Sequence, residues 1–211
     1  MIHNRQIALQ TAGYLLQIKA VKLSPRDLFT WASGIKSPIY CDNRITLSFP
    51  EIRTFIRDQF SMAINAHFGQ VDLVAGVATG GIAQGALVSQ QLELPFVYVR
   101  TTKKDHGLTN LIEGKVEAGQ RVIVVEDLIS TGKSSLEVVQ ALKEAGCEIA
   151  GMVAIFTYNL PVSQVGFRDI KCPLITLTDY DILIEQALAT NYITQDDLSV
   201  LTTFKENLAK K

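Results

Sequence analysis

Residues 121–135 read RVIVVEDLISTGKSS, and this stretch decides the fold of the 211-residue chain. The apolar run at 121–125 has the length of a strand and lacks the alternation of a strand with one face in water. Small and hydroxyl-bearing residues follow it, and apolar residues then recur at helical spacing over 136–145. Strand, turn and helix in this order predict a parallel sheet covered by helices on both faces.

The rest of the chain repeats this alternation. Further buried strands are expected at residues 71–76, 96–100, 149–156 and 174–177. Helices are expected at residues 6–20, 50–67 and 82–92, with a terminal helix within 194–211. We therefore predict an α/β fold with a central, mostly parallel sheet flanked by helices, in which ligands bind at the carboxyl ends of the strands.

Composition excludes several classes of protein. Hydrophobic residues make up 47% and charged residues 19%, as in folded globular chains. The formal net charge of −1 gives no basis for a nucleic-acid or membrane surface, so neither partner is expected. Three widely spaced cysteines favour reduced thiols. Since no signal sequence or bilayer-spanning apolar run is visible, we expect a cytoplasmic protein.

The chemistry is expected where the 121–125 strand ends. Glu126 and Asp127 follow the apolar run, and carboxylates in such a place are costly unless a ligand uses them. Backbone N–H groups of the following turn, together with the positive end of the next helix, suit a phosphate. That turn contains Leu128, Ile129, Ser130, Thr131, Gly132, Lys133 and Ser134. A ribose 5-phosphate offers hydroxyls to the acids and a phosphate to the turn.

Two other interpretations of this stretch exist. Serine and threonine before a helix are common as simple N-caps. Residues 132–134 also match the end of the P-loop pattern for nucleoside triphosphates. Asp127, however, stands where that pattern has its first glycine, and its charge would repel a triphosphate. The acids and the turn together favour a sugar phosphate.

Three motifs carry a resemblance to a known family. Residues 122–134 resemble the phosphoribosyl diphosphate (PRPP) motif of type I phosphoribosyltransferases, with four apolar residues, two acids, two apolar residues and then small residues. Residues 29–44, FTWASGIKSPIYCDNR, resemble the N-terminal hood segment of orotate phosphoribosyltransferases. Residues 100–107, RTTKKDHG, resemble their mobile catalytic loop. The order of the motifs also agrees with that family.

The resemblance implies the type I phosphoribosyltransferase fold in one domain, residues 1–211. Residues 1–48 would form an N-terminal helix and a small hood, residues 49–190 the α/β core and residues 191–211 a C-terminal helix. The implied reaction joins orotate to the ribose 5-phosphate of PRPP in pyrimidine (UMP) synthesis, giving orotidine 5′-monophosphate and diphosphate. A homodimer that shares the mobile loop between its subunits is also implied.

Site residues follow from the same resemblance. Arg100, Lys104 and His106 would be catalytic and would bind the diphosphate of PRPP, with Lys104 as its main electrostatic stabiliser. Residues 126–134 would bind the rest of PRPP, and Ser130 would also contact orotate. Mg²⁺ would be held mainly by the oxygens of PRPP, without a dedicated protein ligand.

The residues of the mobile loop support this interpretation independently. Residues 101–119 are long for a connection in a compact domain and carry Lys103, Lys104 and His106. A basic lid beside a phosphate site excludes water and brings positive charge to a departing diphosphate. The small residues at 78–81, which follow a predicted strand, also suit close approach to a diphosphate.

Four positions depart from the better-known members of the family. Basic residues there are replaced by Ala32, Gly80, Thr101 and Tyr158, so the contacts to orotate are expected to differ more than those to PRPP. Lys36 and Lys103 are candidates to restore positive charge. Two alternative functions remain, a phosphoribosyltransferase for another base and a PRPP-binding regulator without catalysis.

Overall fold

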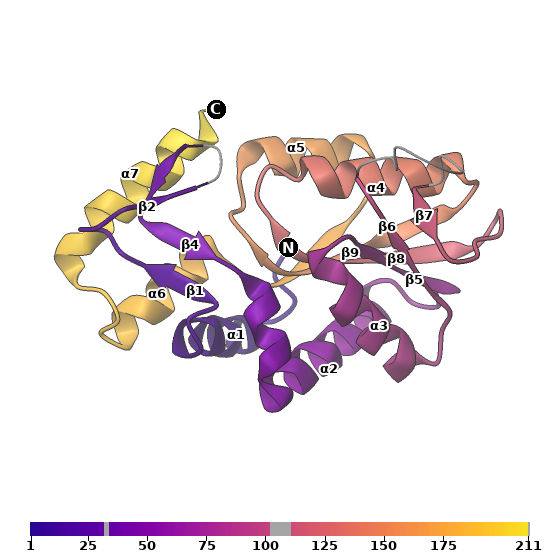
Figure 1. The fold of residues 1–211 in the computed structure, drawn as a ribbon, viewed down its shortest axis with the longest axis horizontal. Coiled ribbons are helices and arrows are strands. Elements are labelled where there is room, and N and C mark those ends of the chain that lie inside the picture. Colours follow the sequence, from indigo (N-terminus) through magenta and orange to yellow (C-terminus); the bar gives the residue numbers. More distant parts are fainter. Residues whose placement is uncertain (32–33, 102–110, 211) are drawn as a thin grey trace.

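The structure, a computed structural model, describes residues 1–31, 34–101 and 111–210, and a six-stranded sheet forms its centre (Figure 1). The strand order is β10-β9-β8-β5-β6-β7. Neighbouring strands from β10 to β6 are parallel, and β7 pairs antiparallel with β6 at the edge. The predicted, mostly parallel sheet is confirmed. Its strands are β5 (Leu73–Val77), β6 (Phe96–Val99), β7 (Ile112–Glu113), β8 (Arg121–Ile129), β9 (Glu148–Thr157) and β10 (Leu174–Asp179).

Helices cover both faces of the sheet (Figure 1). One face packs against α1 (Arg5–Gln17), α2 (Pro50–His67), α3 (Gly80–Leu92) and α6 (Tyr180–Ala189). The other face packs against α4 (Lys133–Glu144) and α5 (Pro161–Asp169). None of the helices in the described residues is both long and apolar enough to span a membrane.

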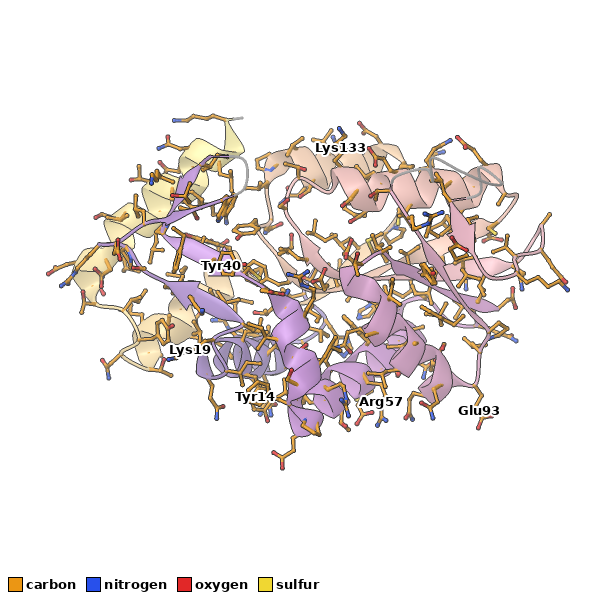
Figure 2. All side chains as sticks on the ribbon, viewed as in Figure 1. Tyr14, Lys19, Tyr40, Arg57, Glu93 and Lys133 are labelled. Carbon is orange, nitrogen blue, oxygen red and sulfur yellow. The ribbon has the colours of Figure 1, made fainter. Side chains whose placement is uncertain are left out.

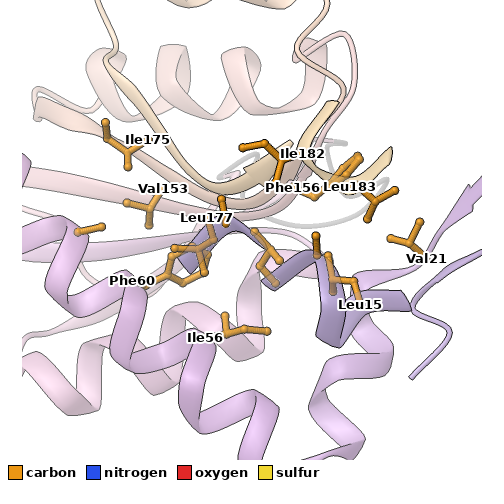
Figure 3. Close-up of a cluster of buried hydrophobic side chains, with 14 of the residues drawn as sticks. Leu15, Val21, Ile56, Phe60, Val153, Phe156, Ile175, Leu177, Ile182 and Leu183 are labelled. Carbon is orange, nitrogen blue, oxygen red and sulfur yellow. The ribbon is translucent and has the colours of Figure 1, made fainter. Parts of the chain in front are cut away.

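Burial on both faces explains why the strands are continuously apolar. In β8, Ile123 and Val125 belong to the core on the α1–α2 side, whereas Val122 and Val124 belong to the core on the α4 side. All four side chains are fully buried, so no position in this part of the strand tolerates a polar residue facing water. Figure 3 shows the first of these cores, where Phe60 and Ile56 of α2 lie near Leu177 of β10.

The hood consists of two small antiparallel sheets beside the core. Strand β1 (Val21–Leu23) pairs with β4 (Ile39–Cys41), and β2 (Phe29–Thr30) pairs with β3 (Lys36–Ser37). The 3-10 helix η1 (Asn43–Ser48) leads from the hood into α2. After α6 the chain returns to the hood through η2 (Gln195–Asp197) and α7 (Leu198–Ala209), and α7 lies along β2 (Figure 1).

Several elements differ from those expected from hydrophobic spacing. Strand β8 continues beyond the acid pair to Ile129, because β9 supplies a parallel partner as far as Thr157. Residues 112–113 form β7 inside a segment expected to be one long loop. Spacing also does not predict α5 and α6, which are short helices whose buried residues come from few turns.

Candidate active site

The two acids of β8 occupy different environments. The Glu126 side chain is only 4% exposed; its Oε2 accepts a hydrogen bond from Ser135 Oγ at 3.0 Å, and its Oε1 accepts one from the Asp127 N–H at 2.9 Å. Burial raises the pKa of Glu126 well above its usual value, and the charge of Asp127 adds to this shift. Glu126 therefore fastens the first turn of α4 to the strand.

Asp127 is the more exposed of the two acids although it is partly buried, and it lies against the loop between β5 and α3. A Cβ placed on Gly80 would be 2.2 Å from Asp127 Oδ1, so the carboxylate rests directly on the Gly80 backbone. Burial raises the pKa of Asp127, while the nearby Arg44 guanidinium opposes that rise. Asn43 Nδ2 donates to the Asp127 carbonyl oxygen at 2.7 Å and links η1 to this strand. In the same loop, the peptide bond between Ala78 and Thr79 is cis.

The turn after β8 is open and rich in donors. Gly132 has a φ of +79° and precedes α4, and no side chain in the described part of the chain caps the helix start. The uncapped N–H groups of the first turn are therefore available to an anion. A cavity of about 470 Å³, here termed the phosphate cavity, lies at this turn. It is lined by Thr101, Leu128, Ser130, Thr131, Gly132, Lys133, Ser134 and Glu137.

A second cavity, of about 240 Å³, lies between the hood and the strand ends, and we term it the base cavity. It is lined by Trp31, Tyr40, Cys41, Leu128, Ser130 and Tyr158. Leu128 and Ser130 line both cavities, so a molecule that filled both would pass over these two residues. In Figure 2, Tyr40 lies on the hood and Lys133 on the core, which marks the two sides of the site.

The base cavity is aromatic, and none of the described residues that line it is charged. Tyr158 is only 2% exposed, and its ring contacts the rings of Trp31, Phe156 and Tyr180 at centroid distances of 5.8, 5.3 and 5.9 Å. Burial raises the pKa of the Tyr158 hydroxyl well above its usual value, so this group stays protonated as a donor. Among the described residues, no hydrogen bond uses that hydroxyl. It can therefore donate to a ligand oxygen.

Only some of the residues expected to contact the diphosphate lie in the described part of the chain. Arg100 lies at the end of β6, where its guanidinium pairs with Glu113 of β7 at 3.1 Å. Thr101 lines the phosphate cavity. Lys103, Lys104 and His106 lie outside the described residues, as does Ala32 of the hood segment.

Sequence patterns miss several residues that form this site. Trp31, Tyr40 and Cys41 were expected only as part of the hood segment, yet they line the base cavity. Asn43 reaches Asp127 across 84 positions of the chain. No local spacing signals such a contact, because the two elements meet only when the hood folds onto the sheet.

Comparisons with known proteins agree with this geometry. The family described as "Phosphoribosyl transferase domain" matches residues 50–182. The orotate phosphoribosyltransferase of Bacteroides fragilis is 55% identical over 94% of this chain and 93% of its own. That of Streptococcus agalactiae is 52% identical over 95% and 96% of the two chains. The chain belongs to the orotate phosphoribosyltransferase family.

Solved structures of this fold are also similar. The orotate phosphoribosyltransferase of Aeropyrum pernix has a TM-score of 0.75 at 24% identity, covering 87% of this chain and 99% of that one. The UMP synthase of Leishmania donovani has a TM-score of 0.78 at 22% identity, covering 95% of this chain and 42% of that one. The type I phosphoribosyltransferase fold expected from the sequence is confirmed. The hood and α7 lie outside the matched family segment, although the hood forms part of the base cavity.

Proposed function

We propose that the protein transfers the ribose 5-phosphate group of PRPP to orotate, giving orotidine 5′-monophosphate and diphosphate in pyrimidine synthesis. The observation that carries this proposal is the pair of cavities that meet at Leu128 and Ser130. An anion-binding turn and an aromatic cavity, which meet at the end of an acid-bearing strand, match the two ends of a nucleotide. The free thiols of Cys41, Cys147 and Cys172 accord with a cytoplasmic location.

Each part of the site then has a distinct role. The N–H groups at the start of α4 hold the 5-phosphate, and Asp127 accepts hydrogen bonds from the ribose hydroxyls. Glu126 supports this arrangement from its buried position through Ser135. Tyr158 and Ser130 offer neutral donors to the oxygens of orotate. A ring nitrogen of orotate attacks the anomeric carbon, so the protein mainly positions the two substrates and stabilises charge.

Mg²⁺ fits the donors that the site contains. Among the described residues no cluster of three His, Cys, Asp or Glu side chains could enclose a metal ion, whereas Asp127 is an accessible oxygen donor. An ion that keeps the oxygens of PRPP as its main ligands needs no such cluster. When bound, Mg²⁺ neutralises charge on the diphosphate that departs.

The basic loop completes the proposed mechanism. Lys104 stabilises the departing diphosphate, and Arg100 and His106 contact the same group. For Arg100 this means exchanging or sharing its ion pair with Glu113 when PRPP binds. We further propose that the protein is a homodimer in which each loop serves the site of the other subunit.

The decisive experiment measures loss of orotate absorbance in a mixture of protein, PRPP, Mg²⁺ and orotate. Turnover of orotate is expected, and turnover of a purine base without turnover of orotate would overturn the proposal. Lys104→Ala is expected to lower kcat by at least about a hundredfold, as for loss of a stabilising charge. If the loop is shared, mixing inactive Lys104→Ala and Asp127→Asn proteins restores part of the activity, because mixed dimers hold one intact site.

A further inference from the structure

We infer that Phe204, on the C-terminal helix α7, is a positioning residue that holds Trp31 at the wall of the base cavity. This inference rests on the proposed function and assigns a role to a helix that carries no chemical group of the site. The rings of Phe204 and Trp31 meet edge to face, with a centroid distance of 5.7 Å and an interplanar angle of 87°. Such pairs stabilise one relative orientation beyond simple burial.

Trp31 links this contact to the base cavity. It lines the cavity, and its ring also meets the ring of Tyr158 at 5.8 Å and 68°. Its indole Nε1 donates to the Ile39 carbonyl oxygen at 3.0 Å, so the indole is already engaged within the hood. The Phe204 ring joins this indole to the C-terminal helix.

The hood strands cannot fix Trp31 alone. Strands β2 and β3 have two residues each, and an isolated two-stranded hairpin is at best marginally stable in water. Trp31 directly follows β2, so its position depends on what packs against this hairpin. Figure 1 shows α7 lying along β2 at this end of the molecule.

Helix α7 is itself fastened to the core. The Tyr180 hydroxyl donates to the Leu201 carbonyl oxygen at 3.0 Å, and the Leu201 side chain is fully buried. Lys205 Nζ forms an ion pair with Asp181 at 2.6 Å. These contacts flank Phe204 on its helix and let it present a fixed ring to Trp31. Tyr180 also stacks on Tyr158, so both walls of the base cavity are linked to α7.

The test uses Phe204→Ala together with the fluorescence of Trp31, which is the only tryptophan in the chain. In the protein without substrates, acrylamide quenching of Trp31 is expected to increase. In the assay, the KM for orotate is expected to rise about fivefold, as for loss of one aromatic pair, while kcat and the KM for PRPP stay close to wild type. Phe204→Tyr should restore both readings.

Val200→Ala is the matched control, because Val200 is 40% exposed on the same helix. It should change neither fluorescence nor KM. Unchanged quenching in Phe204→Ala would overturn the inference, and so would an equal rise of both KM values or a fall in kcat alone. If the wild-type protein does not turn over orotate, the proposed function fails. Increased quenching would then leave the contact established, but its role in binding orotate would be overturned.

Discussion

The Asp127 carboxylate lies so close to Gly80 that a Cβ on Gly80 would be 2.2 Å from its Oδ1 and 2.3 Å from its Cγ. Gly80 therefore provides the space in which the more exposed acid of the site resides. Any side chain at this position would need the acid to move, which explains why a glycine accompanies this placement of Asp127.

Gly80→Ala is accordingly expected to displace Asp127 and to raise the KM for PRPP about tenfold or more, with little loss of stability. Steady-state kinetics with PRPP as the varied substrate measures this effect. Gly81→Ala is the informative comparison, because its Cβ would be 2.3 Å from the Val125 carbonyl oxygen, which is backbone and cannot swing away. Thermal unfolding should therefore show a clear loss of stability in Gly81→Ala, and a larger one than in Gly80→Ala. A Gly80→Ala protein with wild-type kinetics would contradict the proposed role of Asp127.

Glu126 leads to a prediction about pH. Its folded-state pKa is raised, so above the pKa of the unfolded chain the native state keeps a proton that the unfolded state loses. Stability from this group is therefore complete at low pH and is lost as pH rises through the folded pKa. Glu126→Gln does not titrate, so its Tm relative to wild type should be higher at about pH 8 than at about pH 5.

Differential scanning calorimetry at the two pH values measures that difference. Glu137→Gln serves as the control, because Glu137 is an exposed carboxylate on α4, the helix that Glu126 contacts through Ser135. Parallel Tm curves for wild type and Glu126→Gln would show that Glu126 is not held neutral.

Tyr158→Phe removes only the hydroxyl of a residue that lines the base cavity. The three ring contacts of Tyr158 remain, so the fold and the KM for PRPP should be close to wild type. The KM for orotate is expected to rise about tenfold, as for an oxygen that loses its hydrogen-bond donor. Kinetics with orotate varied measures this, and Tyr192→Phe, which lies outside both cavities, is the control. Equal KM values for Tyr158→Phe and wild type would place the orotate oxygens elsewhere.

Gly132→Ala tests the phosphate turn. A side chain at a φ of +79° costs about 1–2 kcal/mol of stability, and here its Cβ would also be 3.1 Å from Phe167. Gly119→Ala is a matched variant, because Gly119 has a φ of +87° but open space around its Cβ. Urea unfolding should show a lower free energy of unfolding in both variants. Kinetics should show a raised KM for PRPP only in Gly132→Ala. If the KM for PRPP rose equally in Gly132→Ala and Gly119→Ala, the turn at Gly132 would have no specific role in phosphate binding.

Local patterns in the sequence account for much of the core. Strand β8 is apolar on both faces because helices cover both faces of the sheet. A continuously apolar strand of this kind predicts a parallel sheet. Helix α2 runs from Pro50 to His67 as expected, since proline favours a helix start and its buried residues follow helical spacing. The acid pair and the turn after it are also local, so their chemistry is visible without a structure.

Contacts between distant segments account for the rest. Glu126 and Asp127 are adjacent acids, yet Glu126 is buried against Ser135 of α4, whereas the more exposed Asp127 lies against Gly80. The base cavity combines Trp31 with Tyr158, and Phe204 of the last helix supports it. Side-chain spacing within one segment determines helices, strands and the phosphate turn, because those depend on local geometry. Which residues face one another across a cavity was decided only by the packing of the hood and α7 on the sheet.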